Sequence, residues 1–210
     1  MPAKKSRKAN NAASSRTPRR KPSVHQLKVT LRDSSPPIWR RFVASSQVDL
    51  GTLHSILQAV MDWTNSHLHQ FDVGGRRISD PAFELDEFED DERTTDEYAV
   101  TLRDVAPNVG DRFDYWYDFG DNWHHDILVE AIRPLKEHAV SVWCLDGARA
   151  CPLDDCGGMS GYEELLTAMA DPKHPDHEQM TEWAGGRFDA EAFDRRPINR
   201  ELARWILSQD

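Results

Sequence analysis

The 210-residue sequence contains no apolar run that approaches the roughly 20 residues of a membrane-spanning helix. Its N-terminus is charged and is not followed by an apolar segment, so no secretory signal is expected. Cysteine is scarce: Cys144, Cys151 and Cys156 are the only three, and an odd, clustered set does not predict a disulfide scaffold. We therefore expect a cytoplasmic protein without a membrane partner.

Several signatures of catalysis are also absent. The sequence has no phosphate-binding P-loop, no dinucleotide-binding glycine pattern and no G-x-S-x-G nucleophile turn. It has no H-E-x-x-H pair or other closely spaced set of metal ligands. These absences favour a protein that is not an enzyme, and they leave open a site assembled from distant segments.

Charge is divided unevenly along the chain, whose formal net charge is −10. Residues 1–24 hold eight basic residues and no acid, and the rest of the chain has a formal charge of −18. A body of that charge repels phosphate backbones, so only the first segment would attract nucleic acid. The basic residues of this segment are Lys4, Lys5, Arg7, Lys8, Arg16, Arg19, Arg20 and Lys21.

Residues 1–24 have almost no apolar side chain to bury. Such a segment cannot offset the entropy lost on ordering, so we predict a disordered basic tail followed by a single domain over residues 25–210. A solvated tail is the favoured interpretation, because short basic segments bind polyanions weakly at physiological salt. The alternative is an arm that binds nucleic acid or an acidic partner.

Apolar periodicity predicts the elements of the first half of the domain. Apolar and polar residues alternate over 27–31, 38–44 and 69–73, which predicts three strands, the first two able to pair as a hairpin. Between them, apolar residues at helical spacing predict a helix over 49–63 with Asp49 as its N-cap. Residues 84–97 contain nine acids and predict a solvated loop.

The second half begins with the strongest strand signal. Aromatic residues alternate with polar ones over 113–119, a Gly-Asp-Asn turn follows, and 123–132 predict the returning strand of a central hairpin. Beyond it, three helices are predicted: one capped by Ser160 and Glu163, and two opened by Pro175 and Pro197. The predicted fold class is α+β: an antiparallel β-sheet with packed helices and a mostly helical C-terminal third.

Histidines and aspartates near the predicted hairpin are the first candidate site. His67 and His69 lie two residues apart, so on a strand both point to one face. Asp118, Asp121 and His124 flank the turn of the aromatic hairpin. Imidazole and carboxylate groups that meet in space hold zinc or another divalent metal. The alternative, that these side chains only pack and hydrogen-bond, is favoured, and no cofactor is predicted.

The cysteines are a second candidate site. Cys144, Cys151 and Cys156 are spaced C-x6-C-x4-C, whereas structural zinc sites usually contain C-x2-4-C pairs. No fourth ligand is evident within the segment, although His138 or His124 would complete a set. Buried free thiols are the favoured interpretation, because free cysteine is among the most buried residue types.

Six short segments carry a resemblance to a known family. They are 27–31 (LKVTL), 36–41 (PPIWRR), 66–71 (SHLHQF), 117–124 (YDFGDNWH), 151–158 (CPLDDCGG) and 161–162 (GY). With these segments in this order, the chain resembles the plasmid pRiA4b ORF-3-like family. The resemblance implies a compact α+β domain of plasmid or mobile-element ancestry and implies little about activity. Where the family often has Pro-Pro-Glu-Asp, this chain has Pro152-Leu-Asp-Asp155.

Three hypotheses for function follow. The first is a non-catalytic binding or accessory module. The second is a metal-dependent hydrolase of the phosphoesterase type that uses the histidine and aspartate candidates. The third is a mobile-element DNA accessory protein that binds through the basic tail.

Overall fold

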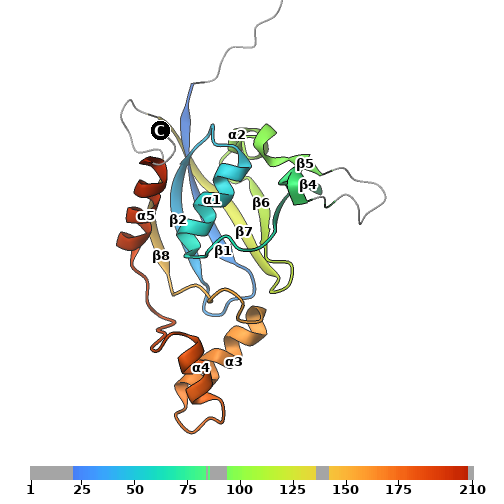
Figure 1. The fold of residues 1–210 in the computed structure, drawn as a ribbon. Coiled ribbons are helices and arrows are strands. Elements are labelled where there is room, and N and C mark those ends of the chain that lie inside the picture. Colours follow the sequence, from blue (N-terminus) through green and yellow to red (C-terminus); the bar gives the residue numbers. More distant parts are fainter. Residues whose placement is uncertain (1–20, 84, 86–93, 136–141, 208–210) are drawn as a thin grey trace, which may run out of the picture.

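The computed structural model describes residues 21–83, 85, 94–135 and 142–207, and within them one eight-stranded sheet has helices on one face and beyond one end (Figure 1). The strand order is β5-β4-β3-β6-β7-β1-β2-β8. The strands are β1 (Ser23–Leu31), β2 (Trp39–Ser45), β3 (His69–Val73), β4 (Arg76–Ser79), β5 (Thr95–Asp96), β6 (Arg112–Tyr117), β7 (Trp123–Pro134) and β8 (Trp143–Ala148). The α-helices are α1 (Leu50–Met61), α2 (Leu102–Val105), α3 (Gly158–Ala170), α4 (His177–Trp183) and α5 (Arg195–Leu207), and two 3-10 helices are η1 (Pro81–Phe83) and η3 (Glu97–Ala99).

The centre of the sheet consists of the two predicted hairpins. β6 pairs with β7 and β1 pairs with β2, both antiparallel, and β1 joins the two hairpins by pairing with β7. Alternate residues of these strands are buried, among them Leu27, Val29, Tyr115 and Ile127. The alternation of apolar and polar residues therefore predicts this part of the fold correctly, because one face of each strand lies against the core.

The prediction of a purely antiparallel sheet is wrong, because the sheet is mixed. β4 and β5 pair in parallel, with Ile78 opposite Thr95 and Ser79 opposite Asp96. After β4 the chain passes through η1 and then forms β5, which runs in the same direction as β4 and is the edge strand of the sheet. β5 has two residues, too few for any periodicity, and lies at the end of the acidic segment predicted as a loop. Residue 84 and residues 86–93 of that segment lie outside the described residues.

The prediction of a mostly helical C-terminal third is also wrong. This part of the chain begins with β8, which pairs with β2 at the other edge of the sheet, and its helices contain 13, 7 and 13 residues. β8 is not evident in the sequence because it has no apolar alternation. β8 is stabilised by hydrogen bonds from α5. The Asn199 side chain accepts from the backbone N–H of Cys144 (2.8 Å) and donates to the Cys144 carbonyl (2.9 Å). An edge strand is thus covered by a helix.

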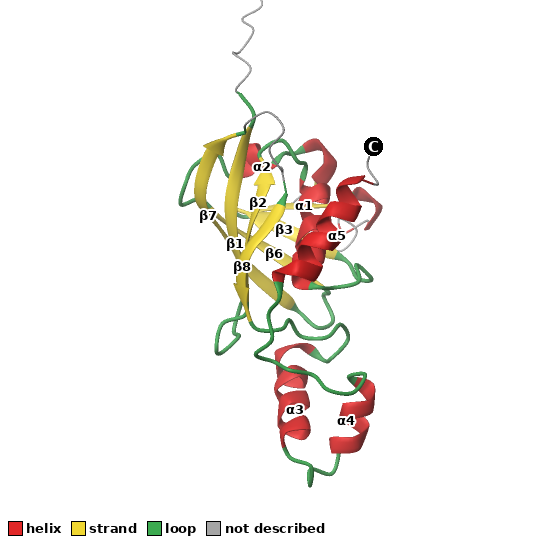
Figure 2. Cartoon of the chain, turned by 90° about the vertical axis from the view of Figure 1, so that its left-hand side faces the viewer, coloured by secondary structure: helices red, strands yellow, loops and turns green. Residues whose placement is uncertain are grey.

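The four longer helices form two pairs that lie differently relative to the sheet (Figure 2). α1 and α5 pack against one face of the sheet, and α1 begins at the predicted N-cap, since the Asp49 carboxylate accepts from the Thr52 N–H (2.6 Å). α3 and α4 extend from one end of the sheet. The N-cap of α3 is Gly157 rather than the predicted Ser160. None of the helices in the described ranges is long and apolar enough to cross a membrane.

The first strand begins at Ser23, two residues before the predicted domain boundary. Of the basic residues assigned to the tail, Lys21 is described, and its carbonyl accepts from the Arg103 guanidinium (2.9 Å). Residues 1–20 lie outside the described residues, so the tail and its proposed binding role stay predictions.

Candidate functional site

Three connections meet at the end of the sheet that faces α3. They are residues 62–68 between α1 and β3, the β6–β7 turn at 118–122, and residues 149–157 before α3. Hydrogen bonds join them: the Asp154 carboxylate accepts from the Thr64 N–H (2.9 Å), and the Asp121 carboxylate accepts from the Gly157 N–H (3.1 Å). Side chains separated by up to 90 residues in the sequence are thereby held together.

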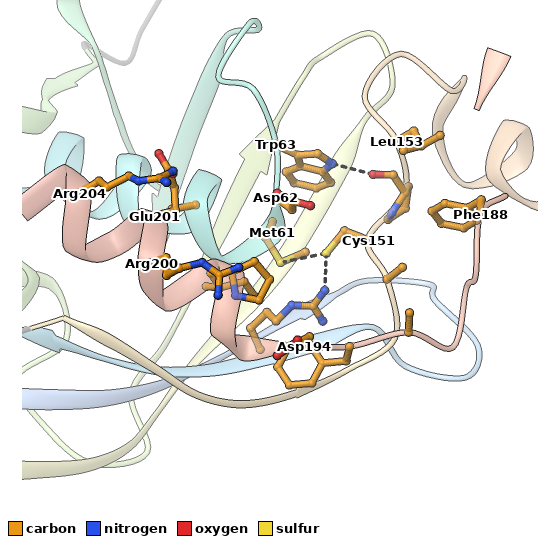
Figure 3. A pocket seen from close by; sticks show the side chains of 18 residues that line it. Met61, Asp62, Trp63, Cys151, Leu153, Phe188, Asp194, Arg200, Glu201 and Arg204 are labelled. Carbon is orange, nitrogen blue, oxygen red and sulfur yellow. Dashed lines mark hydrogen bonds and ion pairs between the residues drawn. The ribbon is translucent and has the colours of Figure 1, made fainter. Parts of the chain in front are cut away.

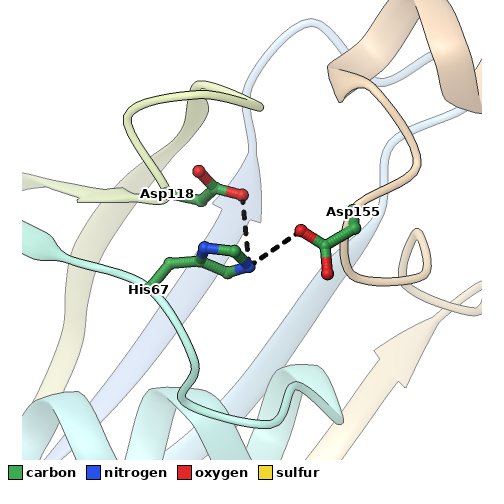
Figure 4. A group of neighbouring side chains, drawn as sticks. All are labelled: His67, Asp118 and Asp155. Carbon is green, nitrogen blue, oxygen red and sulfur yellow. Dashed lines mark ion pairs between the residues drawn. The ribbon is translucent and has the colours of Figure 1, made fainter.

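Asp118 is fixed by the turn that it opens. Its backbone is left-handed (φ 54°), and its Oδ1 accepts from the N–H groups of Gly120 (2.9 Å) and Asp121 (3.3 Å). The side chain is 9 % exposed. With Oδ1 engaged by the turn, Oδ2 is the oxygen that lies toward His67 (Figure 4).

His67 lies in a connection whose backbone is held on both sides. Before it, the Ser66 N–H donates to the Tyr117 hydroxyl (3.2 Å), and after it the Leu68 carbonyl accepts from the Asp118 N–H (2.9 Å). The Nε2 atom of His67 is buried and makes no well-aligned hydrogen bond among the described residues. Its contacts are instead with two carboxylates, since it lies 3.6 Å from Asp118 Oδ2 and 3.1 Å from an oxygen of Asp155.

Asp155 completes this group from the third connection. Like Asp118 it has a left-handed backbone (φ 61°), and its side chain is 70 % exposed. The sequence analysis did not select Asp155 as a candidate, although the Asp154-Asp155 pair beside Cys156 was a signal. Figure 4 shows the imidazole between the two carboxylates, and we name His67, Asp118 and Asp155 the His–Asp–Asp group.

The His–Asp–Asp group has the chemistry of a divalent-cation site. Its three ligand atoms lie within 4.8 Å of one another. Zinc lies about 2.1 Å from nitrogen and oxygen ligands, so two ligands at right angles are about 3 Å apart, which is close to the separations found here. One imidazole and two carboxylates suit zinc or manganese. Because Asp155 is exposed, a cation here would keep coordination positions open to solvent.

Of the five predicted metal ligands, the structure brings His67 and Asp118 together. His69 instead contacts Glu97 (2.8 Å), and both side chains are buried. Asp121 accepts from the backbone of the connection before α3, and His124 stacks on Trp116 (4.7 Å between ring centroids). His69, Asp121 and His124 are not part of the His–Asp–Asp group.

A buried hydrogen-bond network links α1 and β6 to the connection that contains His67. The Tyr115 hydroxyl lies 2.7 Å from His54 Nδ1 and accepts from the Gln58 amide (3.0 Å), and His54 Nε2 lies 2.6 Å from the Asn65 side-chain oxygen. Burial and the neighbouring His69 lower the pKa of His54 to about 3. A neutral His54 that accepts from Tyr115 and donates to Asn65 satisfies every one of these contacts.

His54 and Asn65 of this network line a cavity of about 350 Å³ together with His67. The His69 ring stacks on His54 with 3.4 Å between centroids, and both rings line this cavity together with Glu97. A buried carboxylate–imidazole pair therefore lies in the wall of a cavity that His67 also lines.

The three cysteines are free, and each makes different contacts. Cys144 lies in β8, Cys151 contacts the Arg40 guanidinium (3.0 Å), and Cys156 lies against the Gly158 carbonyl (3.8 Å). Burial raises the pKa of Cys144 and Cys151 to about 11 and that of Cys156 to about 12. Among the described residues, no metal-ligand group includes these thiols.

The family predicted from the sequence is confirmed by comparison with known proteins. The sequence pattern of the family described as "Plasmid pRiA4b ORF-3-like protein" matches residues 23–197. The chain belongs to this family.

Two relatives extend the comparison. The chain is 37 % identical over 189 residues to "Uncharacterized protein y4hQ" of Sinorhizobium fredii, which covers 87 % of this chain and 94 % of the relative. A crystal structure of a protein of unknown function, MM3350 from Methanosarcina mazei Go1, is 33 % identical with a TM-score of 0.73, over 85 % of this chain and 97 % of that one. These similarities support the fold, and both relatives are described as uncharacterised or of unknown function.

Proposed function

We propose that this protein is a binding module that holds one divalent cation in the His–Asp–Asp group and contacts its ligand through the open positions of that cation. The observation that carries the proposal is the convergence of three ligand atoms: the buried Nε2 of His67 faces a carboxylate oxygen of Asp155 at 3.1 Å and one of Asp118 at 3.6 Å. A divalent cation held by these groups would be coordinated by the imidazole nitrogen and would offset the charge of the two carboxylates.

The placement of the ligands supports the proposal further. Asp118 and Asp155 both have left-handed backbones, a conformation that aspartate adopts more often than most residues and that fixes the direction of each side chain within its turn. Each of the three ligands comes from a different connection, so a bound cation would also join three segments of the chain.

The proposal predicts that the protein binds one divalent cation per chain. Wild-type protein freed of metal with EDTA and then dialysed is expected to bind one Mn²⁺ or Zn²⁺ per chain in calorimetric titration. His67→Ala removes one ligand and Asp155→Asn removes the negative charge of another, so each is expected to weaken binding at least tenfold, or about 1.4 kcal/mol. Asp155→Asn keeps the shape of the side chain, and Asn tolerates the left-handed backbone at this position.

His174→Ala is the matched control, because this partly exposed histidine lies between α3 and α4 and outside the His–Asp–Asp group. Its affinity should equal that of the wild type. Equal binding by wild type and by a folded His67→Ala variant would refute the proposal.

A metal-dependent hydrolase is the second candidate function. It is favoured by the cavity of about 350 Å³, where the buried Glu97–His69 pair lies beside His67. Such a pair is a common form of general base. Cation-dependent release of phosphate from p-nitrophenyl phosphate, lost in His69→Gln while cation binding persists, would favour the hydrolase over the binding module.

A further inference from the structure

A second cavity, of about 690 Å³, lies between α1, α5 and the segment before α3 (Figure 3). It shares no lining residue with the His–Asp–Asp group. Its size is within the range of small-molecule sites in proteins, which is roughly 300–1,000 Å³. Its wall contains one unusual group, the side chain of Arg40.

Arg40 is a buried cation, 3 % exposed, whose partners are all uncharged. Its Nε donates to the Val60 carbonyl (3.1 Å), and one terminal nitrogen donates to the carbonyls of Trp39 and Ala148 (both 2.9 Å). The other terminal nitrogen donates to the Cys151 sulfur (3.0 Å). A guanidinium has five N–H groups, so one remains without a partner among the described residues.

No carboxylate in the described parts of the chain forms an ion pair with Arg40, although three acids line the cavity. Asp194 pairs with Arg196 (2.7 Å), and Glu201 pairs with Arg204 (3.3 Å). Asp62, at the C-cap of α1, makes no direct ion pair with Arg40; burial raises the pKa of Asp62, and the charge of Arg40 partly opposes that rise. Cys151 does not neutralise Arg40 either, because burial raises the pKa of its thiol to about 11.

Arg40 thus has no carboxylate in direct contact among the described residues, and a buried guanidinium with a free N–H favours an anionic partner. The wall also includes the aromatic side chains of Trp63, Phe188 and Phe193, and Arg40 lies 4.8 Å above the Phe193 ring. Figure 3 shows Trp63 and Phe188 on the side of the cavity where Cys151 lies. A flat apolar body would pack against such a wall.

We propose that this cavity binds a monoanionic organic acid with an aromatic or apolar body, whose carboxylate pairs with the unpartnered N–H of Arg40. The three acids Asp62, Asp194 and Glu201 line the cavity together with three arginines, Arg40, Arg200 and Arg204, so the lining has no excess positive charge to favour a multiply charged phosphate ester. The proposal is independent of the proposed cation site, and its test is carried out in EDTA.

The test is calorimetric titration at pH 7 with 2-naphthoate and with the uncharged amide of the same shape, 2-naphthamide. The acid is expected to bind once per chain and at least tenfold more tightly than the amide, because a hydrogen bond to a charged group contributes more than a neutral one. Arg40→Met, which removes the charge, should abolish this preference.

A second variant keeps the proposal testable if Arg40→Met does not fold. Ala192 lines the cavity from an exposed position, so Ala192→Trp should fill the cavity and weaken 2-naphthoate binding at least tenfold without altering the core. Ala203→Trp on the exposed side of α5 is the matched control and should bind like the wild type. The proposal is overturned if 2-naphthoate does not bind saturably, if the amide binds equally well, or if Ala192→Trp binds unchanged.

Discussion

The free energy of unfolding is expected to fall steeply as the pH is lowered from about 6.5 toward 3. His54 and His125 are almost fully buried, and burial lowers the pKa of each to about 3. In the unfolded chain a histidine has a pKa of about 6.5. Between these values the unfolded chain binds protons that the folded protein excludes, so acid favours unfolding.

The sign and size of the effect follow from the number of protons. Above pH 6.5 both histidines are neutral in both states and their contribution does not change with pH. Below it, each excluded proton lowers stability by up to about 1.4 kcal/mol per pH unit, so the two together lower it by up to about 2.7 kcal/mol per unit. Over two units this approaches the total stability of an ordinary domain.

One substitution tests the contribution of His125 alone to the pH dependence of stability. His125 is fully buried, its Nε2 has no partner among the described residues, and its Nδ1 makes one long contact with the Tyr115 carbonyl (3.3 Å). His125→Phe keeps a ring of similar size and cannot be protonated. Urea unfolding at pH 7.0, 6.0, 5.0 and 4.5 should show a slope for this variant about 1.4 kcal/mol per pH unit smaller than that of the wild type.

The control is again His174→Ala, whose slope should match the wild type because His174 is partly exposed. Carboxylates with lowered pKa values, such as Glu130 beside Arg41, lose their contribution only near and below pH 4.5, in all variants alike. A wild-type slope below about 0.5 kcal/mol per unit between pH 6 and 5 would contradict neutral burial of these histidines.

Sequence periodicity predicts the centre of the sheet and not its edges, for a physical reason. β1, β6 and β7 place alternate side chains in the core, so their apolar pattern repeats every two residues. β5 is too short to have a pattern, and β8 is stabilised by the Asn199 side chain and by pairing with β2. Contacts of this kind depend on the tertiary structure, which a local pattern does not contain.

The same distinction explains the candidate site. The spacing of His67 and His69 predicts that both side chains point to one face of a strand. In the structure β3 begins at His69, and His67 lies in the connection before it. Asp118 can be predicted as a candidate from the sequence because it lies next to the turn residues of the aromatic hairpin. Asp155 joins His67 only because the segment before α3 approaches the β6–β7 turn, and that approach depends on glycines rather than on ligand spacing.

Two glycines of α3 allow this close approach. A side chain at Gly158 would lie 2.5 Å from the Asp121 carbonyl oxygen, and its backbone is left-handed (φ 68°). A side chain at Gly161 would collide with the carbonyl group of Cys156, the residue that follows Asp155. α3 can therefore hold the Asp155 segment in place only if position 161 has no side chain.

Gly161→Ala is accordingly expected to destabilise the protein by about 2–3 kcal/mol, the upper part of the range for overpacking. Within an ordinary helix, the same change would stabilise by about 0.5–1 kcal/mol, so even the sign of the effect tests the close approach. Ser160→Ala, at the neighbouring exposed position of α3, should change stability by less than about 0.5 kcal/mol.

Cation affinity gives a second measurement on the same variant. Because the Cys156 backbone must move away from α3, Asp155 should move with it, and the Gly161→Ala variant should bind Mn²⁺ at least tenfold more weakly while Ser160→Ala binds normally. If Gly161→Ala is more stable than the wild type, α3 does not pack against Cys156 as described. If it is destabilised but binds the cation normally, the position of Asp155 does not depend on this contact, and the connection would be held mainly by the bonds from Thr64 to Asp154 and from Gly157 to Asp121.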